Sequence, residues 1–122
     1  MNKMTNRYKG WTQKFIIKGR QEEMKGYLRV SERDDGTLHG IQLDIHREGS
    51  FAKAFANAFA ASMNIGLQNG VPLSVYVEAF KDWKFEPYGK VECSDSIKIA
   101  QSLLDYVMRE LEVKYLGGKA DV

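Results

Sequence analysis

LHGIQLDIHREGSFAKAFANAFAASMNIGLQ, residues 38–68, changes its hydrophobic period once along its length. In its first part apolar and polar side chains alternate, and a period of two is typical of a half-buried β-strand. From Ser50, a residue type that caps helices well, the spacing becomes three and four, which predicts a helix over residues 50–68. The predicted apolar stripe consists of Phe51, Phe55, Ala58, Phe59, Ser62 and Ile65. We expect these residues to face the core and this helix to be the buried central one.

Two stretches upstream also have strand character. Thr12–Lys18 is rich in large apolar and β-branched residues, and Tyr27–Glu32 alternates between apolar and polar ones. Between the second stretch and the strand at Leu38–His46 lies Asp35-Gly36, a pair that supplies the positive φ of a tight hairpin. We therefore expect a three-stranded antiparallel β-meander with one face in water.

Two further helices are expected downstream of the long one. Pro72 suits a first helical position, and the apolar spacing predicts helices over Pro72–Phe80 and Ser96–Leu116. A loop over residues 81–93 separates them. The predicted fold class is α+β, with two layers: a three-stranded antiparallel β-meander followed by three helices packed on one face.

Length and composition indicate one soluble domain. The chain has 122 residues, with 18 basic and 16 acidic side chains and a net charge of +2. The two signs are well mixed, so we expect neither a membrane nor a specific nucleic acid as partner. We expect a single domain over residues 1–122, with a loose N-terminal arm over about 1–10 and a loose tail over 117–122. A complete gene product and an excised domain both stay open, with the first favoured by Met1.

Cysteine usage and the N-terminus bear on the compartment. The only cysteine is Cys93, so the chain has no internal disulfide and no cysteine-rich metal site. The first residues contain no apolar run of the kind that marks a signal peptide. We expect a reducing, cytoplasmic location.

The segment His46-Arg47-Glu48-Gly49-Ser50 is a candidate binding site. It joins the end of a strand to the start of a helix, where free backbone N–H groups can hold an anion. The candidate nucleotide- or anion-binding residues are His46, Arg47, Gly49 and Ser50. A metal on the acidic and histidine side chains here is the less favoured interpretation, because structural zinc sites use four closely spaced ligands. We expect no metal.

The loop after the second helix interleaves aromatic and basic residues. The candidate interface or ligand residues are Trp83, Lys84, Phe85 and Tyr88. Such a pattern can stack bases or bind nucleotides, and large aromatic residues also anchor protein interfaces. The favoured interpretation is nevertheless that Trp83 and Phe85 fill the core while Pro87 and Gly89 shape the loop.

Cys93 precedes the last predicted helix. A thiol at a helix N-terminus has a lowered pKa, but a nucleophilic cysteine also needs a base that orients it, and neither histidine suggests one. Asp95 and Ser96 are interpreted as residues that begin the helix. We therefore expect Cys93 to be a small, buried or half-buried thiol at a helix start, and we assign no catalytic residue.

Several stretches together resemble one known family. They are GWTQK (residues 10–14), NIGLQNGVPLSVYVEAF (64–80), KFEPYG (84–89) and SDSIKIAQSLLDYVMRELEVKYLG (94–117). Over about residues 8–117 the chain resembles the C-terminal region of adenosylcobalamin-dependent (class II) ribonucleotide reductases. In wider relatives this module is the TSCPD domain, named after a five-residue signature. Val91–Asp95 lies at that signature, and only Cys93 and Asp95 match it.

The resemblance implies a role in deoxynucleotide supply. Reductases of this family reduce ribonucleotides by radical chemistry with adenosylcobalamin, and their catalytic part uses several cysteines. The present chain has one, and a single thiol cannot both carry a radical and supply a dithiol. We therefore expect a non-catalytic accessory or binding module that binds no cofactor itself. Its expected partner is a reductase large subunit or a second copy of the chain.

Two other functions stay open at this point. One is a small nucleotide- or anion-binding regulatory protein, suggested by the helix start at Ser50 and the basic aromatic loop. The other is an enzyme that uses Cys93.

Overall fold

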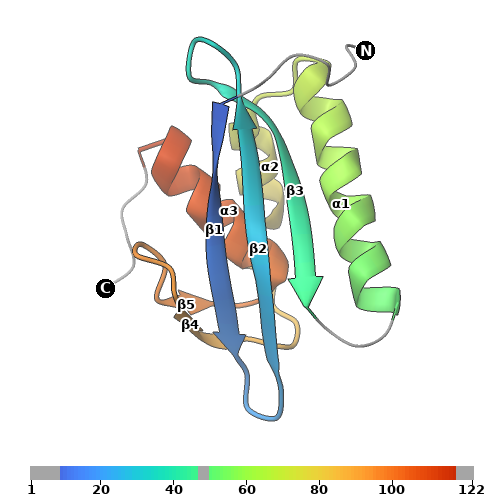
Figure 1. Ribbon diagram of the computed structural model, residues 1–122, viewed down its shortest axis with the longest axis vertical. Helices are drawn as coiled ribbons and strands as arrows, with labels where there is room; N and C mark the ends of the chain where they lie inside the picture. Colours follow the sequence, from blue (N-terminus) through green and yellow to red (C-terminus); the bar gives the residue numbers. More distant parts are fainter. Residues whose placement is uncertain (1–8, 47–49, 118–122) are drawn as a thin grey trace.

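The computed structural model describes residues 9–46 and 50–117 of the chain. Five strands and three helices follow one another in the α+β arrangement of Figure 1. They are β1 (Lys9–Lys18), β2 (Glu23–Glu32), β3 (Leu38–His46), α1 (Ser50–Gln68), α2 (Leu73–Phe80), β4 (Gly89–Glu92), β5 (Ile99–Ala100) and α3 (Leu103–Tyr115). No helix in this part of the chain is long and apolar enough to cross a membrane.

The sheet has five antiparallel strands in the order β3-β2-β1-β4-β5, so the prediction of three strands is wrong. The meander β1-β2-β3 is present, and β1 begins at Lys9, inside the arm that was predicted to be loose. β4 and β5 are too short for a period of two to be detected in their sequences. β4 forms because Ile16, Ile17 and Lys18 of β1 offer it a pairing edge.

The core lies between one face of the sheet and the helices. Alternate residues of the three long strands point inward, including Phe15, Leu28 and Leu43. Every helix adds buried side chains to this core, and α3 adds the most. In Figure 1, α3 crosses behind the sheet while α1 runs alongside β3.

α1 has the predicted bounds but buries a different face. Its buried side chains are Ala56, Ala60, Met63 and Leu67. Three members of the predicted stripe are large apolar residues that remain exposed: Phe51 (81%), Phe55 (43%) and Ile65 (60%). Both stripes have helical spacing, and the face with two alanines allows the helix backbone to lie close to β3. The prediction that α1 is the buried central helix is therefore wrong, and α3 has that place.

α3 begins at Leu103 and not at Ser96. Ser102 is its N-cap, with a hydroxyl that accepts the Asp105 N–H at 3.1 Å. Upstream, the Ser94 hydroxyl accepts the N–H of Ile97 at 3.0 Å and closes a turn there instead of a helix. Asp95 and Ser96 are therefore not helix-start residues.

One side chain of α1 pairs with the outer edge of β3 at Ile41. The Asn64 amide accepts the Ile41 N–H at 2.8 Å and donates to the Ile41 carbonyl at 2.8 Å. A Cβ on Gly40 would lie 3.1 Å from Asn64 Oδ1, so glycine leaves room for this contact. Because exposed strand edges invite pairing with other chains, Asn64 protects the sheet as well as fixing α1 to it.

A polar cluster is buried under the sheet. Glu110 is 1% exposed, and its Oε2 accepts the hydroxyls of Ser94 at 2.8 Å and Tyr106 at 2.7 Å. Burial and the neighbouring Glu110 carboxylate both raise the pKa of Tyr106. Burial and a hydrogen bond to Glu32 also raise the pKa of Tyr115.

Stability should therefore fall at alkaline pH. Above about pH 10 the unfolded chain loses tyrosine protons that the folded chain retains, so each such tyrosine lowers the free energy of unfolding by about 1.4 kcal/mol per pH unit. In Tyr106→Phe, urea unfolding between about pH 10 and 11.5 should give a slope shallower by that amount. At neutral pH the free energy of unfolding of the variant should be lower by about 1–2 kcal/mol, because Glu110 loses the Tyr106 hydroxyl as a hydrogen-bond donor. A slope equal to that of the wild type would contradict this assignment.

Candidate binding groove

An apolar groove of about 560 Å³ opens where four parts of the chain meet. These parts are the start of β2, the first two turns of α1, the loop after α2 and the first turn of α3. The lining residues are Glu22, Met24, Phe51, Ala52, Phe55, Trp83, Phe85, Glu86, Leu103 and Leu104. We call this feature the aromatic groove.

Buried aliphatic side chains form the floor of the aromatic groove, and exposed rings form its rim. Leu103 and Leu104 are 3% and 2% exposed, whereas Phe51 is 81%, Trp83 51% and Phe55 43% exposed. The rings of Phe51 and Phe55 stack with their centroids 6.2 Å apart. A cluster of exposed large apolar side chains beside a concave surface is typical of a binding site.

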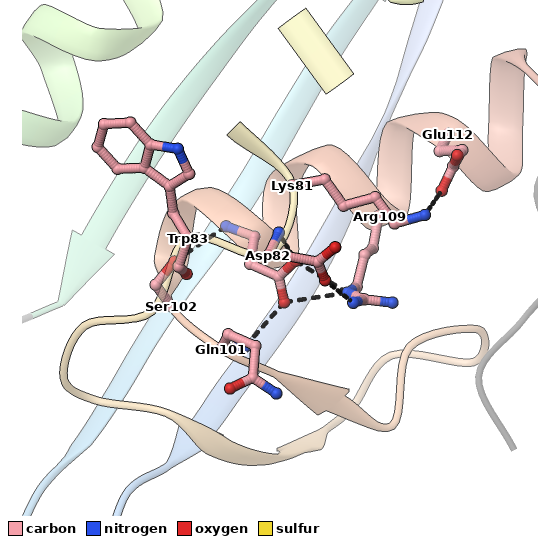
Figure 2. Close-up of polar contacts among 8 residues, drawn as sticks. Lys81, Asp82, Trp83, Gln101, Ser102, Arg109 and Glu112 are labelled. Carbon is pink, nitrogen blue, oxygen red and sulfur yellow. Dashed lines mark hydrogen bonds and ion pairs between the residues drawn. The ribbon is translucent and has the colours of Figure 1, made fainter. Parts of the chain in front are cut away.

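Polar contacts hold Trp83 in place on its backbone side. Its carbonyl accepts the Ser102 hydroxyl at 2.6 Å, and the preceding residue, Asp82, has a φ of +72° and donates its N–H to Asp105 at 2.7 Å. The indole packs against the Phe80 ring, 5.2 Å between centroids. Figure 2 shows the indole pointing away from these polar contacts, toward α1. The rim residue is therefore positioned by its backbone, and its ring remains available.

Asp105 is the centre of this network. It is fully buried, and its two carboxylate oxygens accept the N–H groups of Asp82 and Gln101 at 2.7 Å each. The Arg109 Nε contacts both oxygens, at 2.9 and 3.0 Å. One carboxylate thus joins the loop after α2, the end of β5 and α3.

Two ion pairs lie closer to solvent. Arg109 Nη2 is 2.5 Å from Asp82 Oδ1, and Lys81 Nζ is 2.8 Å from Glu112 Oε1, as Figure 2 shows. Each partly exposed ion pair contributes only about 0–1 kcal/mol to stability. The buried carboxylate of Asp105 therefore contributes more to holding the loop after α2 in place.

The structure divides the four predicted loop residues into two pairs. Trp83 and Phe85 line the aromatic groove. Lys84 and Tyr88 do not, and the Lys84 ammonium lies 4.5 Å from the centre of the Tyr88 ring. Phe51 and Phe55 were missed as site residues because their helical spacing predicted a core position.

The predicted nucleotide- or anion-binding segment is only partly described. His46 is exposed at the end of β3, with its Nε2 3.7 Å from Asp44 Oδ2. Arg47 and Gly49 lie outside the described residues, as does the side chain of Ser50. This site therefore stays a prediction. Within residues 9–46 and 50–117, no group of three or more His, Cys, Asp or Glu side chains is arranged to hold a metal ion.

Cys93 is exposed, and the expectation of a buried or half-buried thiol at a helix start is wrong. The residue follows β4 in the turn toward β5, with a φ of +76°. Its carbonyl accepts the Gln13 side-chain amide at 2.7 Å, which fixes the turn to β1.

Comparison with known proteins finds one family. The model of the TSCPD domain matches residues 3–115. The vitamin B12-dependent ribonucleotide reductase of Bradyrhizobium diazoefficiens is 51% identical over 115 residues, and that of Agrobacterium fabrum is 50% identical, each alignment covering 94% of this chain and 9% of the relative. The reductase of Streptomyces avermitilis is 34% identical over 107 residues, which are 88% of this chain and 11% of the relative. No solved structure matches.

Removing the central carboxylate should destabilise the protein strongly. Asp105→Ala removes the buried acceptor of two backbone N–H groups and of the Arg109 Nε, so the free energy of unfolding should fall by about 3–5 kcal/mol. The matched control is Asp34→Ala at an exposed turn position, which should change it by less than about 0.5 kcal/mol. Urea unfolding followed by circular dichroism measures both. Similar losses in the two variants would contradict the role of Asp105.

The backbone of Cys93 predicts an unusual order of substitutions. At a φ of +76°, Cys93→Gly should be neutral or stabilising by up to about 1 kcal/mol, whereas the β-branched Cys93→Val should cost about 1 kcal/mol or more. The thiol should also react with Ellman's reagent in the folded protein. Equal stability of the two variants, or a thiol protected until unfolding, would contradict the observed turn.

Proposed function

This chain belongs to the TSCPD domain family, and on that premise we propose that it is a non-catalytic accessory or binding module of ribonucleotide reduction. It spans about a tenth of the length of the curated relatives that it matches, and those relatives are named vitamin B12-dependent ribonucleotide reductases. Its part in the reaction is to associate with a reductase polypeptide. The single cysteine in the sequence supports a non-catalytic role, because one thiol cannot supply a dithiol.

The aromatic groove is the observation that carries this proposal. Phe51, Phe55 and Trp83 expose large apolar surfaces around one hollow, although hydrophobic burial would stabilise the fold if they turned inward. Large aromatic residues contribute most of the binding free energy in many interfaces. Covering the roughly 250–450 Å² that these three rings expose would contribute about 6–11 kcal/mol before the costs of association, at about 25 cal/mol per Å² of apolar surface.

Binding to a reductase tests the proposal directly. The probe is the Bradyrhizobium diazoefficiens reductase with the matching region removed, and the readout is the dissociation constant from calorimetry. Trp83→Ala and Phe51→Ala should each weaken binding by about five-fold or more, because each removes an anchor ring. The matched control is Val75→Ala on α2, a residue that is 51% exposed like Trp83 but outside the groove; it should change the dissociation constant by less than about two-fold.

Two outcomes would count against the proposal. One is the absence of binding between the wild-type chain and the shortened reductase. The other is equal weakening by Val75→Ala and Trp83→Ala, which would locate the contact elsewhere.

A further inference from the structure

Among the described residues that line the aromatic groove, the two charged ones, Glu22 and Glu86, are both acidic. Glu86 is exposed and Glu22 half-buried at the groove, and no lysine or arginine is among the described residues that line it. The nearest basic residue in the loop, Lys84, has its ammonium over the Tyr88 ring, 4.5 Å from its centre. The groove therefore combines an apolar floor with an acidic border, although the whole chain has a net charge of +2.

Resting on the proposed function, we propose that this groove binds a short amphipathic segment that is rich in lysine or arginine. One or two large apolar side chains of the segment enter between Phe55 and Trp83 and cover Leu103 and Leu104. Its basic side chains lie toward the exposed carboxylate of Glu86. An apolar groove that accepts the apolar stripe of a helix is a common mode of peptide recognition. Complementary charges at the rim then select among apolar segments.

A second copy of the chain fits this surface less well. A two-fold pair uses the same patch on both subunits, which brings the acidic borders of the two grooves together. The exposed parts of Phe51, Phe55 and Trp83 amount to roughly 250–450 Å², taking 150–250 Å² for each aromatic side chain. A stable protein interface buries about 800 Å² on each partner. The groove has instead the size of a site for one or two anchor residues.

Two synthetic peptides distinguish the effect of peptide charge on binding from the effect of the apolar side chains. Both are fluorescein-labelled, have equal length and carry leucine at the same helical positions; the other positions are all lysine in one and all glutamate in the other. Fluorescence anisotropy should give a dissociation constant at least about ten-fold lower for the leucine–lysine peptide. The net positive charge of the chain would favour binding of the leucine–glutamate peptide. A preference for the leucine–lysine peptide would therefore come from the acidic residues at the groove.

Variants of the chain locate the binding. Glu86→Lys should weaken binding of the leucine–lysine peptide about five-fold or more and strengthen binding of the leucine–glutamate peptide, because it reverses the charge at the rim. Trp83→Ala should weaken both peptides, and Val75→Ala should change neither by more than about two-fold. Equal affinity for the two peptides, or no effect of Glu86→Lys, would overturn the inference. So would a dimer in sedimentation experiments that Trp83→Ala dissociates, since the groove would then bind a second copy.

The same variants distinguish this inference from the proposed function. If the shortened reductase binds and Trp83→Ala weakens it but Glu86→Lys does not, the function stands and the basic segment is refuted. If the reductase does not bind but the leucine–lysine peptide does, with the expected dependence on Glu86, the basic segment stands and the partnership with the reductase is refuted.

Discussion

The buried carboxylate of Asp105 is the interaction on which the second half of the structure depends. A carboxylate removed from water is costly unless its oxygens are hydrogen-bonded, and here two backbone N–H groups and Arg109 satisfy them. The two backbone donors belong to segments on either side of the β4–β5 pair. Their attachment to one side chain brings the loop of Trp83 to the start of α3, and without it the groove would lack one wall.

The second constraint is the choice of face on α1. The helix presents its alanines to β3, and the Asn64 amide fixes this orientation by pairing with the backbone of Ile41. The consequence is that Phe51 and Phe55 face water beside Trp83. The packing of the alanine face of α1 on the sheet therefore leaves Phe51 and Phe55 at the surface. For this reason the same helix both stabilises the fold and supplies the rim of the aromatic groove.

Much of the meander could be predicted from local patterns. The alternation in β3, the Asp35-Gly36 turn and the bounds of α1 depend on neighbouring residues, so periodicity detects them. Trp83 and Phe85 were named as candidate interface residues from the aromatic and basic pattern of the loop, although the same pattern favoured a core position for them. β4 escaped prediction because a four-residue strand has no measurable period, and its pairing partner lies far away in the sequence.

The sequence by itself determined the α+β class, the three long strands, the helical segments and the family, since each depends on short-range spacing or on residue identity. Tertiary structure alone decided which of two equally spaced stripes of α1 is buried, where α3 begins, and that Cys93 is exposed in a turn. In each case the local sequence pattern is compatible with more than one arrangement. Contacts between distant residues select one: Asn64 with β3, Ser94 with Glu110, and Gln13 with the Cys93 carbonyl.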